Sequence, residues 1–275
     1  MRSLRWFLAA VPLAAATTAA GCNQISGVSD YEKAPQQIVA PCAVNADCAA
    51  LGEGYICRKG VASYCVSLFS AECPTASGNY QSDEAFIFAS ILPTAQGPSP
   101  GPGVSLLNAM RLAISDFKDS AFGLPPLAEG RDRRQVAMLE CNDEGNVETA
   151  VKAASHAVRD VGLPAVLGPM FSGITLKVAT DITIPNGAFL LSPTAATQSL
   201  TLLEDFGLVW RAAPSADLQV KVLASFMKVL EADPAARAQF GVAPTEKIRV
   251  ASVFKGDAFG RGLAEGLLAE LSFNG

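Results

Sequence analysis

Histidine is almost absent from this chain, because its 275 residues contain only one, His156. Metal centres and Ser-His-Asp triads rely on histidine as a ligand or a general base, so the sequence offers little material for either. Charged residues are also scarce, at 17% of the chain, and no run of basic residues occurs. Nucleic-acid binding depends on clustered Lys and Arg side chains, so we expect no nucleic-acid partner.

Complete enzyme motifs are missing as well. Gly101-Pro102-Gly103 lacks the third glycine of a dinucleotide-binding loop, and its proline removes an amide donor. Ser172 does not stand in a Gly-x-Ser-x-Gly elbow, because Met170 occupies the place of the first glycine. We therefore expect no enzyme, no cofactor and no metal site. Hydrophobic residues, by contrast, make up 50% of the chain, which excludes intrinsic disorder and supplies a substantial core.

The first 21 residues are typical of an export signal. Arg2 and Arg5 precede an apolar run from Trp6 to Ala20, which is short for a membrane span of about 20 residues. The segment Ala19-Ala20-Gly21-Cys22 resembles the lipobox of bacterial lipoproteins, which implies that Cys22 is lipidated and becomes the mature N-terminus. An ordinary cleaved signal followed by a chance cysteine is the alternative. Acylation would anchor an exported protein to the membrane of the cell envelope.

Residues 22–84 form a cysteine-rich leader or linker. An exported protein meets an oxidising compartment, so disulfides are expected there, although spacing does not fix their connectivity. Zinc is disfavoured because no CxxC pair occurs and the single histidine is distant. Cys141 follows an apolar run and is either a sixth disulfide partner or a buried free thiol. The candidate disulfide cysteines are Cys42, Cys48, Cys57, Cys65, Cys73 and Cys141.

From residue 85 the sequence alternates between short apolar runs and amphipathic segments. We predict strands at 86–92, 136–139, 165–167 and 188–191, and helices at 104–117, 147–161 and 172–182. Asn146 is a good N-cap for the second helix, Gly162 ends it, and His156 is expected on its solvated face. This alternation predicts an α/β fold with a parallel sheet covered by helices on both faces.

Beyond residue 212 the pattern predicts a helix at 217–230 that Pro234 closes, a strand at 248–254 and a helix at 258–273. The loops that follow the predicted strands are rich in hydroxyl residues, Gly and Pro. Because the carboxyl ends of parallel strands meet at one edge of the sheet, we expect these loops to border a ligand cleft.

The order of segments from Phe86 to Phe273 resembles the type I periplasmic binding proteins, in the Leu/Ile/Val-binding branch that serves ABC transporters of branched-chain amino acids. The resembling segments are Ile91-Leu92-Pro93-Thr94, Asn142-Asp143-Glu144, Gly168-Pro169-Met170-Phe171-Ser172-Gly173, Ile184-Pro185, Leu191-Ser192-Pro193-Thr194-Ala195, Val209 to Ser215, Val250 to Phe254 and Asp257 to Gly262. The resemblance implies a parallel sheet flanked by helices in two lobes that close on a small molecule. It makes residues 85–212 the ligand-binding lobe I and 213–275 the start of an incomplete lobe II, so we expect a fragment of a longer reading frame.

The same resemblance implies the ligand-binding positions. Ser172 and Thr194 would donate hydrogen bonds to the ligand, and Ala195 lies in the same loop as Thr194. Ala196 stands where the family has a further Thr, and Phe259 stands where it often has Tyr, so an aromatic surface remains without a donor. The implied ligand is a small polar molecule, an amino acid or a related solute, and the implied partner is an ABC permease. A lipoprotein that uses the fold for sensing or protein docking is the alternative.

Overall fold

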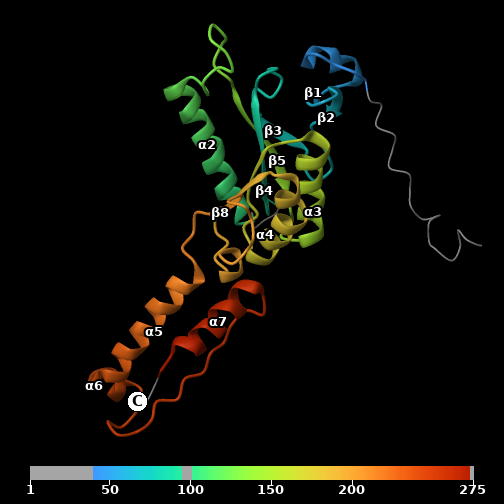
Figure 1. Cartoon of the computed structure of the whole chain (residues 1–275). Coiled ribbons are helices and arrows are strands. Elements are labelled where there is room, and N and C mark those ends of the chain that lie inside the picture. The colour runs from blue at the N-terminus through green and yellow to red at the C-terminus, as the bar shows by residue number, and fades with distance from the viewer. Residues whose placement is uncertain (1–39, 95–100, 273–275) are drawn as a thin grey trace, which may run out of the picture. The chain divides into compact units, whose positions relative to one another are not determined.

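A six-stranded sheet organises the part of the chain that the computed structural model describes, residues 40–94 and 101–272 (Figure 1). The strand order is β3-β5-β4-β6-β7-β8, in which β3 runs antiparallel to β5 and all other neighbours are parallel. The strands are β3 (Thr75–Gly78), β4 (Phe86–Leu92), β5 (Val136–Asn142), β6 (Ala165–Leu167), β7 (Phe189–Ser192) and β8 (Val209–Arg211).

The centre of the sheet is the parallel pair β4 and β5. Seven residue pairs join them, from Phe86 opposite Val136 to Leu92 opposite Asn142. Most residues of both strands are buried, as expected for strands covered on both faces. The predicted α/β fold with a mostly parallel sheet is therefore confirmed, and the strands predicted at 86–92 and 165–167 have the predicted bounds.

Helices cover both faces of this sheet (Figure 1). Helix α2 (Gly103–Ala121) packs its Leu107 with Phe88 and Met138 in a small cluster on one face. Helices α3 (Val147–Ser155) and α4 (Ser172–Val178) cover the other face and bury the larger cluster. Both continue as π-helical segments, η3 (His156–Val161) and η4 (Ala179–Thr183). The short helices η5 (Ile184–Asn186) and η6 (Gln198–Leu200) flank β7.

The cysteine-rich segment, which we expected to be stapled by disulfides, forms a small helix and a hairpin before it supplies β3 to the sheet. It contains the helix η2 (Asn45–Leu51) and a hairpin of β1 (Tyr55–Arg58) and β2 (Tyr64–Ser67). Three disulfides join Cys42 to Cys57, Cys48 to Cys65, and Cys73 to Cys141. The expected disulfides are therefore present, and the alternative of a free thiol at Cys141 is wrong.

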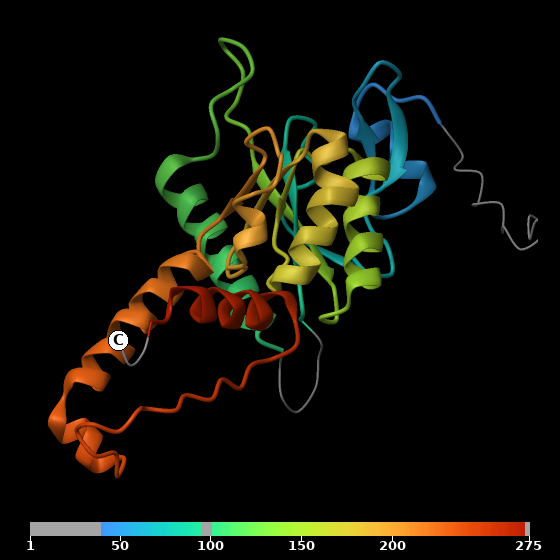
Figure 2. The same ribbon diagram turned by 60° about the horizontal axis from the view of Figure 1, so that its bottom comes forward.

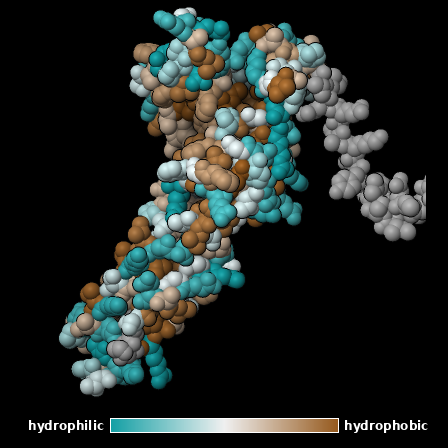
Figure 3. All heavy atoms as spheres, viewed as in Figure 1, coloured by the Kyte–Doolittle hydropathy of each residue, from teal (hydrophilic) through white to brown (hydrophobic). Residues whose placement is uncertain are grey.

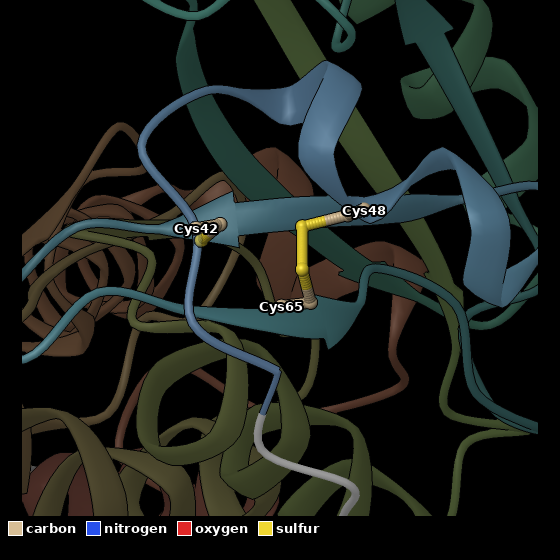
Figure 4. A group of neighbouring side chains, drawn as sticks. All are labelled: Cys42, Cys48 and Cys65. Atoms are coloured by element: carbon tan, nitrogen blue, oxygen red, sulfur yellow. A yellow bond between two sulfur atoms is a disulfide. The ribbon is translucent and has the colours of Figure 1, made fainter.

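Cys42 and the bonded pair Cys48 and Cys65 lie near one another beside the hairpin (Figure 4). Their sulfur atoms lie within 4.8 Å of one another. Each of these sulfurs is already bonded to another sulfur, and zinc coordination requires free thiolates. The cluster is therefore explained by two neighbouring disulfides.

Polar contacts hold this hairpin against the end of η3. The Arg58 guanidinium donates hydrogen bonds to the carbonyl oxygens of Arg159, at 2.7 Å, and Asp160, at 2.8 Å. The His156 ring Nε2 lies 3.0 Å from the carbonyl oxygen of Leu68. Since a carbonyl can only accept, Nε2 carries the proton of this bond. The His156 side chain is only 14% exposed, so the prediction of a solvated histidine is wrong.

Helices α5 (Ala216–Ala232), α6 (Pro234–Gln239) and α7 (Ala258–Glu270) follow the sheet. Pro234 begins α6 behind an Asp233 cap, so it does more than close the preceding helix. The strand predicted at 248–254 is wrong, because these residues are extended but pair with no strand in the described chain. The apolar pattern alone does not make a strand, because a β-ladder also needs a neighbouring strand beside it.

Apolar side chains remain exposed on α5 (Figure 3). Leu218, Val222, Phe226 and Val229 are each more than half exposed.

Among residues 40–94 and 101–272, no helix has the length and the apolar character needed to cross a membrane. The predicted export signal and Cys22 lie outside the described residues, so their roles stay predictions.

A charged cluster joins β3 to the rest of the sheet. The Glu140 side chain on β5 is 5% exposed and forms a bidentate salt bridge with the guanidinium of Arg111 on α2. The Thr75 hydroxyl donates to Glu140 Oε2 at 3.1 Å, and the Ser77 hydroxyl donates to Oε1. Burial alone would raise the pKa of Glu140, but the Arg111 and Ser77 bonds outweigh it and lower the pKa below its usual value.

Replacing Glu140 by Gln should destabilise the protein by about 1–3 kcal/mol at pH 7, because buried charge-assisted hydrogen bonds are lost. A carboxyl whose folded-state pKa is lowered stabilises the fold above its unfolded pKa, and this contribution disappears as the pH falls through the folded value. The difference between wild type and Glu140→Gln should therefore shrink below about pH 4.5.

Urea unfolding at pH 7 and pH 3 measures both effects. The control is Glu84→Gln, which removes the more exposed ion pair with Arg131 and should cost less than about 1 kcal/mol. Equal losses for the two variants at pH 7 would contradict the role given to the Glu140 cluster.

Candidate functional site

A cleft of about 880 Å³ opens at the carboxyl ends of the central strands. Its walls come from the loops after four consecutive parallel strands in the chain: Pro93 after β4, Glu144 and Gly145 after β5, Phe171 and Ser172 after β6, and Thr194 after β7. Lys255, Asp257 and Phe259, from the segment that begins α7, close the opposite side. This is the ligand position that parallel sheets favour.

The start of α7 lies close to α4. Figure 2 shows α7 crossing below the strand ends beside this helix. A Cβ atom on Gly173 would lie 3.9 Å from the Cβ of Ala258, so the two helices approach in van der Waals contact. Two elements far apart in the sequence thus meet around one cleft.

Ser172 begins α4 and organises the neighbouring loop. Its side chain is 5% exposed, and its Oγ accepts hydrogen bonds from the backbone N–H groups of Ala196, at 3.3 Å, and Thr197, at 3.4 Å. A hydroxyl also carries one proton that it can donate. Ser172 lines the cleft, and these contacts also give its hydroxyl a structural role, whereas its contact with a ligand stays a prediction.

Thr194 also lines the cleft, but its proton is engaged. The Thr194 hydroxyl donates to the carbonyl oxygen of Met170 at 2.8 Å, which leaves its oxygen as an acceptor. This arrangement suits a ligand donor such as an ammonium group. It is less suited to the hydrogen-bond donation expected from the sequence.

The next two predicted positions do not line the cleft. Ala195 and Ala196 are buried, and their amides are bonded to the hydroxyls of Ser192 and Ser172. Ala196 also accepts a hydrogen bond from the Ala216 amide through its carbonyl. Both residues therefore hold the loop in place through buried backbone hydrogen bonds, and neither lines the cleft.

Phe259 belongs to a mixed aromatic and charged rim. Its side chain is 36% exposed on the first turn of α7, where Asp257 caps the helix by accepting from the Gly260 amide at 2.8 Å. Lys255 pairs with Asp257 at 2.7 Å and lies 5.6 Å from the centre of the Phe171 ring. The Gly260 amide and then Lys255 lower the pKa of Asp257, so this carboxyl stays charged at neutral pH.

Sequence reasoning missed several lining residues. Glu144, Phe171, Lys255 and Asp257 border the cleft, although no role was predicted for their side chains. The first two follow strand ends, which was a usable signal. Lys255 and Asp257 follow a predicted strand that does not form, so nothing in their local pattern placed them beside α4.

Comparison with known proteins identifies the family. Residues 89–275, about two thirds of the chain, match the sequence model described as periplasmic binding protein. The chain belongs to the periplasmic binding protein family. No curated protein sequence matches it.

Solved structures share the fold of this periplasmic binding protein. An ABC transporter substrate-binding protein from Desulfitobacterium hafniense is 20% identical, with a TM-score of 0.50 over 70% of this chain and 49% of that one. A leucine-binding protein from Thermotoga maritima is 19% identical, with a TM-score of 0.50 over 68% and 45% of the two chains. The branched-chain amino acid transporter substrate-binding protein of Streptococcus pneumoniae, solved with isoleucine, is 17% identical, with a TM-score of 0.51 over 69% and 47%. The chain thus spans about half the length of these proteins.

Asp143 is a buried acid next to the cleft of this binding protein. It has no exposed surface, its Oδ1 accepts from the Gly145 amide at 2.8 Å, and its Oδ2 has no hydrogen-bond partner. Burial raises the pKa of Asp143, and the Gly145 bond offsets this only in part. The folded state therefore favours the protonated carboxyl more than the unfolded state does.

Replacing Asp143 by Asn keeps an acceptor for the Gly145 amide and removes the ionisable carboxyl. A carboxyl with a raised folded-state pKa destabilises the fold as the pH rises through that value. The stability of Asp143→Asn relative to wild type should therefore increase between about pH 4 and pH 7, as measured by urea unfolding. A relative stability that stays constant over this range would show that burial does not raise the pKa of Asp143.

Replacing Ser172 by Ala should destabilise the protein by about 1–3 kcal/mol, because two loop amides lose their acceptor in a buried position. Hydrogen exchange at the amides of Ala196 and Thr197 should accelerate. Thr194→Val is the matched control, since it removes one exposed hydrogen bond and should leave these two amides protected. Unchanged exchange in Ser172→Ala would refute this role for the hydroxyl.

Proposed function

We propose that the protein binds a small solute, an amino acid with an apolar side chain, and acts as the exported substrate-binding component of an ABC-type uptake system. The observation that carries this proposal is the cleft of about 880 Å³ at the strand ends, a size within the range of small-molecule sites. Family membership favours a binding protein over an enzyme.

The character of the walls supports this ligand class. Met170, Phe171, Ile174 and Phe259 offer an apolar surface against which an aliphatic side chain would pack. Polar groups stand beside it, including the Thr194 oxygen as an acceptor for an ammonium group. The solved protein from Desulfitobacterium hafniense was obtained in complex with leucine, which makes leucine the natural first probe.

The cellular setting follows from the same proposal. An export signal over residues 1–21 and lipidation of Cys22 would place the protein in the periplasm or cell envelope, held to the membrane by its acyl chains. Three disulfides in the described chain suit such an oxidising compartment. An ABC permease would then receive the bound solute.

A lipoprotein that uses the fold for protein docking is the second candidate. It is favoured by the engagement of the Thr194 proton and of the Ala195 and Ala196 amides within the protein, which leaves fewer donors for a ligand carboxylate. Recovery of the same envelope protein by wild type and by a Ser172→Ala, Thr194→Val double variant would favour docking over solute binding.

Thermal unfolding of the full chain with each of the twenty amino acids tests the first proposal, because a ligand that binds only the folded state raises its stability. L-leucine should raise the melting temperature. Phe259→Ala should weaken leucine binding about tenfold in calorimetric titration, the equivalent of roughly 1.4 kcal/mol of apolar contact.

Phe206→Ala is the matched control, because Phe206 is highly exposed and does not line the cleft. It should bind leucine as wild type does. No stabilisation by any amino acid would contradict the proposed ligand class, and equal affinity of the Phe259→Ala variant would remove this residue from the site.

A further inference from the structure

The disulfide between Cys73 and Cys141 lies near the end of β5 that leads into the cleft wall. Cys141 is the sixth residue of β5, and the loop that begins after Asn142 supplies Glu144 and Gly145 to the cleft wall. The bond spans 68 positions of sequence and ties the cysteine-rich segment to this strand end. A hydrogen bond lies next to the disulfide: the amide of Asn142, which follows Cys141, donates to the carbonyl oxygen of Glu72, which precedes Cys73, at 2.8 Å.

The side chain of Asn142 connects this attachment point to the two segments that border the cleft. Its side-chain Oδ1 accepts hydrogen bonds from the amides of Thr94, at 2.9 Å, and Glu144, at 3.0 Å. One carboxamide thus joins the chain after β4 to the loop after β5, and both segments border the cleft at Pro93 and Glu144.

The loop needs such support because of its backbone. Glu144 has a φ of +53°, a left-handed conformation that costs energy for a residue with a side chain, and Gly145 follows at +68°. A conformation of this kind persists when surrounding contacts determine it. The contacts here are the Asn142 bond to the Glu144 amide and the Asp143 bond to the Gly145 amide.

We propose that the Cys73–Cys141 disulfide is a positioning element of the binding site, which acts through Asn142 to hold the β5–α3 loop in its ligand-binding conformation. The cysteine-rich segment thereby controls solute affinity without touching the solute. The other two disulfides both close within residues 42–65, where they join η2 and the segment before it to the hairpin, so we expect them to stabilise the hairpin and leave this loop unchanged. The link to affinity rests on the proposed solute-binding function, whereas the positioning of the loop does not.

The test compares the Cys73→Ala, Cys141→Ala double variant of the full chain with the control Cys42→Ala, Cys57→Ala. Hydrogen exchange reports on the loop without any ligand, and calorimetric titration with L-leucine reports on affinity. In the first variant, exchange at the Thr94 and Glu144 amides should accelerate at least tenfold and the Kd for leucine should rise about tenfold. The control should match wild type at both amides and in Kd.

Asn142 variants provide a second route that keeps all disulfides. Asn142→Ala should accelerate exchange at the same two amides and weaken leucine binding, whereas Asn142→Asp, which retains the acceptor, should restore both toward wild type. Adding Asn142→Ala to the Cys73→Ala, Cys141→Ala variant should have a less than additive effect, because both changes release the same loop. If the double cysteine variant does not fold, the pair of Asn142 variants decides the test.

Unchanged exchange at Thr94 and Glu144 in folded Cys73→Ala, Cys141→Ala protein, or equal losses in the control, would overturn the proposal. Full additivity with Asn142→Ala would also overturn it, because the disulfide would then act elsewhere. If wild type binds no leucine but the two amides respond as described, the solute-binding function fails for leucine and the positioning of the loop stands.

Discussion

The parallel pairing of β4 with β5 is the constraint on which the rest of the described structure depends. Seven residue pairs fix the register of the two strands, and this register brings both carboxyl ends to the same level. Asn142 can therefore reach the Thr94 amide across the ends of the two strands. The parallel strands β6 and β7 continue the same edge, so four successive loops converge on one cleft.

The cysteine-rich segment extends the sheet on the other side of β5, away from β6 and β7. β3 adds an antiparallel edge to β5, and the bonds from Thr75 and Ser77 to Glu140 join that edge to Arg111 on α2. The Cys73–Cys141 disulfide adds a covalent link one residue beyond Glu140. β3 precedes the family match, which begins at residue 89, and yet it belongs to the sheet whose strand ends border the cleft.

Local sequence pattern predicted the elements whose signals are local. The apolar run of β4, the Asn146 cap of α3 and the left-handed Gly162 after η3 depend on neighbouring residues alone, and all three are present. Elements that depend on distant partners were missed or wrong. β3 has few apolar residues and exists because β5 pairs with it, whereas residues 248–254 have the apolar pattern of a strand but belong to neither sheet of the described chain.

For the candidate site, the sequence indicated several residue positions but not their hydrogen-bond partners. Ser172, Thr194 and Phe259 came from a family resemblance and do line the cleft, but their hydrogen-bond roles did not follow from sequence, because the partners Ala196, Thr197 and Met170 are brought together only by the fold. The disulfide connectivity was likewise open, since spacing does not determine which of six cysteines become neighbours.

An NMR titration of the full chain with L-leucine would show most directly whether the strand-end cleft binds a small apolar amino acid, as proposed. Binding in the cleft should concentrate the chemical-shift changes at Glu144 and Gly145, at 171–174 and at 257–259, and should leave the groove between Phe240 and Val250 unaffected. Saturable changes confined to that groove, or no changes at any leucine concentration, would contradict it.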